Sequence, residues 1–237
     1  AARLARRAEG YPSVTMTIET DEAPAETETL LYDYPGQTDE WVVLSAHVDG
    51  HDLAESAMDN GTGLAAVLAV TRALAPRVAG WRRGLRVMFF SVEEWALTGS
   101  AQYVEALSPA ERQRIALNVN LDSVAGSPRL AALSSGYPGV EPFILRTAEA
   151  TGLSVRTVRP LMTNSDHANF AQGGIPALRL VAGFDDPAAN LRLVLTPADT
   201  RDKVEPGELR SATLCTAALV AAACQADPAE AARWRAR

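Results

Sequence analysis

The sequence is poor in the residues on which several protein classes depend. It has only two cysteines among 237 residues, too few for a fold held together by disulfides. It also has only three histidines. Its longest apolar run, Ala217 to Cys224, is far shorter than the ~20 residues that cross a bilayer. With 22 Lys and Arg against 29 Asp and Glu, the net charge argues against nucleic acid or an anionic membrane as a partner.

The two cysteines, Cys215 and Cys224, fall on one predicted helix. A rise of about 1.5 Å per residue separates them too far for a disulfide. We therefore expect two free thiols that are buried as small apolar side chains.

The composition that remains is ordinary for a globular protein, with 47% apolar and 22% charged residues. It predicts a single domain over residues 1–237 with one sizeable core. The chain starts at Ala1 without an apolar signal-peptide segment, so we expect that it lacks an N-terminal segment of a longer protein. Its cellular compartment and oligomeric state stay open.

Strand-like and helix-like patterns alternate along the chain. Strands are predicted at 14–19, 29–34, 41–46, 85–91, 115–121, near 130, at 155–158 and at 177–181, and the first two form an expected hairpin at a sheet edge. Helices are predicted at 61–75, ending before Pro76, and at 99–107, 140–150, 167–172 and 207–226. This order predicts an α/β fold: a mixed, mainly parallel twisted sheet with helices on both faces.

Ionisable residues gather at the ends of several predicted strands. His47 and Asp49 follow one predicted strand, Glu93 and Glu94 follow another, and Asp122 follows a third, while Asp59 precedes a predicted helix. Ligands of such sheets bind beyond the carboxyl ends of the strands. Each carboxylate alone is explained by a solvated loop or, for Asp59, a helix N-cap. Together they would repel one another unless a cation neutralised them, and imidazole with carboxylates suits Zn or Mn.

The spacing of these residues suggests individual roles. Residues two apart on a strand share a face, so Asp49 is placed to orient His47 through its other ring nitrogen. Glu93 and Glu94 point in different directions, so one can bind metal while the other acts as a general base. Asp59, arriving from another segment, is placed to bridge two metals.

The strings AHVDG (46–50), MDNGTG (58–63), SVEEWALTGS (91–100), NLDS (120–123), SDHANF (165–170), GIPALRL (174–180) and TPADT (196–200) resemble, in order, the motifs of the co-catalytic zinc exopeptidases. That family includes bacterial leucyl aminopeptidases, glutamate carboxypeptidases and glutaminyl cyclases, and its fold is a three-layer sandwich. The resemblance covers about residues 12–225. It implies a metallopeptidase that holds one or two zinc ions and acts on a peptide or amino-acyl substrate.

The resemblance also implies a role for each matching residue. His47 and Asp122 would hold one metal, Asp59 would bridge, and Glu94 would hold the second metal. Glu93 would be the general base that takes a proton from a metal-activated water and returns it to the leaving amine, and Asp49 would support His47. These roles make an aminopeptidase the expected activity.

One position departs from the family pattern. The family has a histidine ligand of the second metal directly before the T-x-x-D-T string, where this chain has Leu195. His167 or His51 could substitute, water could complete a weakened site, or a single metal could bind. For His167, a hydrogen-bonded residue at a helix start is the favoured interpretation.

Other functions fit the sequence less well. Residues 61–66 match the G-x-G-x-x-G/A dinucleotide fingerprint, but a polar loop of a dozen residues separates them from the preceding strand. The sequence lacks the G-x-S-x-G motif that carries the nucleophile of many serine hydrolases. A degenerate relative that serves as a binding or regulatory domain stays an alternative, as does a carboxypeptidase or amidohydrolase.

The substrate-binding residues are not determined by the sequence. Glu93, Asp166 or Asp185 could bind a substrate ammonium group. Tyr137 is a candidate oxyanion donor, although a plain turn residue is favoured there. We expect Arg179 and Arg192 on the surface rather than in a carboxylate-binding cluster.

Overall fold

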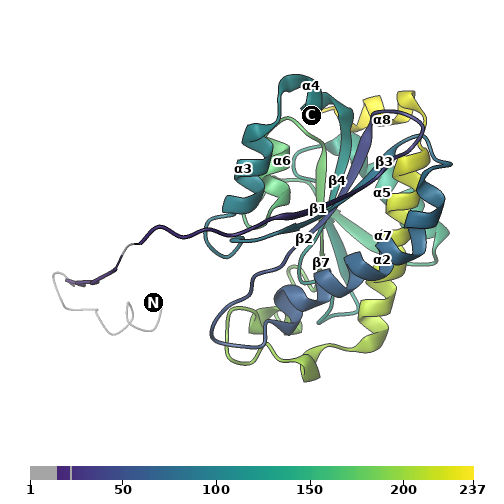
Figure 1. Cartoon of the computed structure of the whole chain (residues 1–237). Coiled ribbons are helices and arrows are strands. Elements are labelled where there is room, and N and C mark those ends of the chain that lie inside the picture. The colour runs from purple at the N-terminus through teal and green to yellow at the C-terminus, as the bar shows by residue number, and fades with distance from the viewer. Residues whose placement is uncertain (1–14, 22) are drawn as a thin grey trace.

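A seven-stranded sheet in the order β1-β3-β2-β4-β7-β5-β6 forms the centre of the molecule (Figure 1). The computed structural model describes residues 15–21 and 23–237. The strands are β1 (Leu30–Tyr34), β2 (Trp41–His47), β3 (Gly84–Phe90), β4 (Ile115–Leu121), β5 (Leu130–Leu133), β6 (Val155–Val158) and β7 (Ala177–Ala182). All seven residues of β4 are buried, as expected for an apolar strand covered on both faces.

The sheet is mixed and mainly parallel, as predicted. Strands β3, β2, β4 and β7 run parallel to one another, whereas β1 and β5 pair antiparallel to β3 and β7. The carboxyl ends of the four central strands therefore lie side by side at one end of the sheet. Because β5 is antiparallel to β7, the turn after β5 lies at the other end of the strands.

Helices cover both faces of the sheet, which completes the predicted three layers (Figure 1). Helices α2 (Gly63–Val78), α5 (Glu141–Ala150) and α7 (Pro206–Gln225) pack together on one side, and α3 (Thr98–Ala106) and α6 (His167–Gln172) on the other. Two further helices, α4 (Pro109–Arg114) and α8 (Pro228–Trp234), contact β4. Short helical turns are η1 (Ala57–Thr62), η2 (Pro138–Val140), η3 (Asn190–Leu193) and η4 (Arg201–Lys203).

Helix α7 carries the two cysteines, and both are buried and free, as predicted. Its apolar face packs against α2 and α5. Within the described part of the chain no single helix has the length and apolarity to cross a bilayer, and α7 with α8 meets those criteria only as a pair bent by 119°.

Two predictions about elements are wrong. The expected hairpin is absent: residues 15–19 form no strand, and β1 pairs instead with β3. Residue 14, the first of that predicted strand, lies outside the described residues. Helix α2 continues past Pro76 to Val78. Pro76 is exposed and so is Arg72, so the carbonyl left without an N–H donor faces water and the break costs little.

Candidate metal centre

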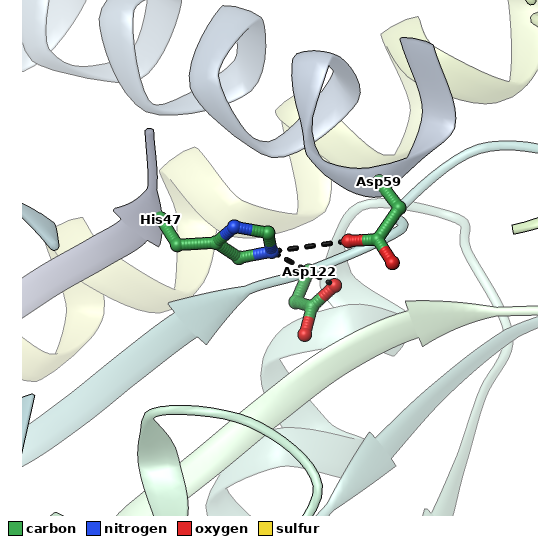
Figure 2. A group of neighbouring side chains, drawn as sticks. All are labelled: His47, Asp59 and Asp122. Carbon is green, nitrogen blue, oxygen red and sulfur yellow. Dashed lines mark hydrogen bonds and ion pairs between the residues drawn. The ribbon is translucent and has the colours of Figure 1, made fainter. Parts of the chain in front are cut away.

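Three side chains meet where β2 and β4 end (Figure 2). His47 is the last residue of β2, Asp122 follows β4, and Asp59 lies in η1 before α2. The His47 Nε2 atom lies 3.0 Å from Asp59 Oδ1 and 3.7 Å from Asp122 Oδ1. Ligand atoms around a tetrahedral zinc ion lie about 3.3 Å apart, because each bond is about 2.0 Å long. The spacing and the chemistry of these donors therefore fit one metal ion.

Asp49 orients His47, mainly through its backbone. The Nδ1 atom of His47 lies 3.1 Å from the Asp49 main-chain oxygen and 3.5 Å from its carboxylate. A proton on Nδ1 satisfies this contact and leaves Nε2 as the ligand atom. The Asp49 carboxylate also accepts a hydrogen bond from the Glu94 N–H at 3.1 Å. It thus joins the segments that follow β2 and β3.

Asp199 holds the loop that carries Asp59. Its buried carboxylate accepts hydrogen bonds from the N–H groups of Met58, at 2.7 Å, and Asp59, at 3.1 Å. The sequence placed Asp199 in the TPADT string without assigning it a role. The structure gives it one: it fixes the backbone of Asp59, a candidate metal ligand, from a distant part of the chain.

Asn60 connects the start of α2 to the end of β4. Its Oδ1 accepts a hydrogen bond from the Gly63 N–H at 3.0 Å, and its Nδ2 donates to the Leu121 carbonyl at 2.8 Å. A Cβ on Gly63 would lie 2.1 Å from Asn60 Oδ1 and 2.7 Å from the Leu121 oxygen. Gly63 is thus required for close packing, which explains the second glycine of the apparent dinucleotide fingerprint. Asn60, rather than Asp59, satisfies the helix N-terminus.

Arg179 is buried beside Asp122, so the prediction that it lies on the surface is wrong. Its Nη2 atom lies 3.1 Å from Asp122 Oδ2, and its Nη1 donates to the Asn164 carbonyl at 2.9 Å. The cause is its position in β7, where it pairs with Asn120 of the adjacent strand. Burial alone would raise the pKa of Asp122, but Arg179 and His47 hold it well below its usual value.

The charges around the site call for a cation. Burial would lower the pKa of His47, but the carboxylates of Asp122, Asp49 and Asp59 outweigh it and raise that pKa well above its usual value. Burial and the charge of Asp122 raise the pKa of Glu93 to about 9. A divalent cation among these groups would stabilise their ionised forms.

Glu94 lies beside Glu93, after β3, and is less buried. Burial and the charge of Asp59 raise the pKa of Glu94 to about 6. Its Oε1 atom is shielded from water and has no hydrogen-bond partner among the described residues. Neither glutamate belongs to the group of three converging donors.

Residues 29–220 match the family model described as "Peptidase family M28". The chain belongs to peptidase family M28. It is 30% identical over 179 residues to leupeptin-inactivating enzyme 1 of Streptomyces exfoliatus, a match covering 72% of this chain and 40% of that protein. It is 27% identical over 184 residues to aminopeptidase YwaD of Bacillus subtilis, covering 75% of this chain and 40% of the relative. The family resemblance inferred from the motifs is confirmed.

The M28 fold is confirmed by solved structures. A zinc aminopeptidase from Bacillus subtilis superimposes with a TM-score of 0.76 and 24% identity, over 86% of this chain and 51% of that one. This chain therefore spans two fifths of the length of the two sequence relatives and about half of that structural neighbour.

The two remaining histidines of this M28 chain do not join His47. His167 is fully buried, and burial together with Arg179 lowers its pKa to about 3. Neither of its ring nitrogens has a hydrogen-bond partner among the described residues, so the expected hydrogen bond at the helix start is absent. The Nδ1 atom of His51 accepts a hydrogen bond from the Leu53 N–H at 3.4 Å. Leu195 is half exposed, with a left-handed φ of 59°.

The structure also narrows the candidates for substrate contacts. Asp166 is buried within electrostatic reach of His47, and burial raises its pKa to about 7. Asp185 is exposed and pairs with Arg156 at 2.9 Å, near β6 at the far edge of the sheet. Of the three candidates for binding an ammonium group, Glu93 and Asp166 therefore lie near the candidate metal centre.

Tyr137 is not placed to stabilise an oxyanion. It follows β5, which is antiparallel to β7, so Tyr137 lies at the end of the strands opposite the candidate metal centre. Its side chain is buried, and its hydroxyl donates to the Ala171 carbonyl at 3.3 Å. Arg192 is exposed, as expected, and donates to carbonyls of its own turn.

Proposed function

We propose that this chain is the catalytic domain of a zinc-dependent aminopeptidase. The observation that carries the proposal is the convergence of His47, Asp59 and Asp122 beside Glu93, at the carboxyl ends of adjacent strands. Membership of a peptidase family makes a peptide the substrate. Aminopeptidases among the relatives and solved neighbours support removal of N-terminal residues.

The chain's own residues would divide the work of hydrolysis. A zinc ion at this site would lower the pKa of a bound water to about 7, polarise the peptide carbonyl and favour ionised Glu93. Glu93 would accept the proton of the attacking water and return it to the leaving amine. Asp49 keeps the His47 ring oriented, and Asp199 keeps the Asp59 loop in place.

The test compares the zinc-loaded protein with its Glu93→Gln variant on leucine p-nitroanilide and on N-acetylated leucine p-nitroanilide. Loss of a general base lowers turnover by about 10²–10⁴-fold, while zinc content should stay unchanged because Glu93 is outside the converging donors. Glu105→Gln, an exposed glutamate on α3, is the matched control and should keep full activity.

Three outcomes would contradict the proposal. Full activity of Glu93→Gln would show that another group is the base. Equal hydrolysis of the N-acetylated substrate would exclude an aminopeptidase. Ligand binding without turnover in the zinc-loaded wild type would instead favour the binding or regulatory domain.

A further inference from the structure

The candidate metal centre is complete for one ion and incomplete for a second. His47, Asp59 and Asp122 each offer one donor atom, and these atoms all lie within 4.8 Å of one another. Three protein ligands and an open position are the usual composition of a catalytic zinc site. In residues 15–21 and 23–237, no second group of three His, Cys, Asp or Glu donors converges in this way.

A second ion that shared Asp59 with the first would have to use its other carboxylate oxygen. Glu93 and Glu94 are both in electrostatic reach of Asp59 and outside the first group. Glu93 is the proposed base, which leaves Glu94, whose Oε1 has no partner among the described residues. Asp59 and Glu94 would supply at most two ligands. A third would have to come from a neighbouring segment.

Leu195 lies on such a segment and supplies no ligand. Asp199, four residues further along, accepts the N–H groups of Met58 and Asp59, so the segment that carries Leu195 is fastened to the Asp59 loop. Leu195 is half exposed and has a φ of 59°. Histidine is enriched in this left-handed region, whereas a bulky leucine is uncommon there. The backbone at residue 195 therefore suits histidine at least as well as leucine.

We infer that this chain holds a single zinc ion, bound by His47, Asp59 and Asp122, and that Leu195 prevents tight binding of a second. The inference rests on the proposed function, since it concerns the metal of that same site. In this arrangement Glu94 lies near the single ion as a free carboxylate and does not bind a second metal.

The experiment counts metal ions and does not depend on turnover. The whole chain is stripped with a chelator, reloaded with excess ZnSO₄, dialysed against metal-free buffer and analysed by plasma mass spectrometry. We expect about one zinc per chain for the wild type and about two for Leu195→His. Leu193→His, the same exchange two residues away at the end of η3, is the matched control and should stay at one.

Cobalt substitution gives an independent count. Titration with CoCl₂ should end at one equivalent in the wild type and at two in Leu195→His, as followed by visible absorption. Thermal unfolding of each metal-free variant checks whether the substitutions leave the fold intact.

The outcomes separate this inference from the proposed function. Two tightly held ions in the wild type would overturn the inference while leaving a zinc peptidase intact. A count of one in Leu195→His would refute the role given to Leu195. No zinc in the wild type would contradict both the inference and the proposed function.

Discussion

Replacement of Asp199 by alanine tests whether a distant carboxylate sets the geometry of the candidate metal centre. In the native chain the two oxygens of Asp199 accept one hydrogen bond each, from the N–H groups of Met58 and Asp59. Alanine removes both acceptors without adding bulk. The backbone of the Asp59 loop then loses its fixed position relative to His47.

The structure sets the size of the effect. A hydrogen bond to a charged acceptor contributes about 1.5–3 kcal/mol. The Met58 contact is buried, but Asp59 is partly exposed, so water can replace part of the second bond. We expect the metal-free protein to lose about 2–4 kcal/mol of unfolding free energy. Loss of a group that orients a metal ligand typically lowers metal affinity by about 10–100-fold.

Urea unfolding of the metal-free protein measures the first quantity, and zinc titration against a competing chelator measures the second. Asp202→Ala is the control, because Asp202 is exposed and contacts only Thr200 and Lys203 among the described residues. It should change stability by no more than about 0.5 kcal/mol. If Asp199→Ala matched this control in both stability and zinc affinity, the role assigned to Asp199 would be refuted.

Two further predictions concern the interior. Arg179→Met removes one of the two partners of the buried Asp122 charge and leaves only His47, so we expect a loss of about 3 kcal/mol, the lower end of the range for a broken buried pair, in urea unfolding of the metal-free protein; unchanged stability would contradict the buried ion pair. Burial raises the pKa of Cys215 to about 11 and that of Cys224 to about 12. Neither thiol should react with a thiol reagent at pH 8 until urea unfolds the chain, when both should, and rapid labelling of the native protein would refute their burial.

The elements that the sequence predicted are those with strong periodicity or long apolar runs. Strand β4 and helices α6 and α7 occur within one residue of their expected bounds. Helix α4 was missed because it is six residues long with no buried side chain, although Ser108 and Glu111 form a capping box at its start. Apolar and polar residues alternate in the 15–19 segment as in a strand, but this pattern does not show whether a partner strand lies close enough to pair with it.

The sequence was enough to bring together the three candidate ligands, but not the residues that support them. His47, Asp59 and Asp122 follow apolar strands or precede a helix, a pattern visible in the sequence. Arg179 was misassigned because sequence position does not reveal that β7 is central in the sheet. A charged residue inside an apolar strand was the available signal. Asp199 could not be assigned, because its partners lie more than 100 residues away.

The contact between Asp199 and Met58 spans 141 residues of chain, which has a consequence for how the site assembles. The entropic cost of closing a loop grows with the logarithm of its length and is about 4 kcal/mol for this span. That cost is offset only after the strands between the two residues have paired. We therefore expect the Asp59 loop to acquire its final geometry late in folding, so that zinc affinity would report on the completed sheet rather than on any local segment.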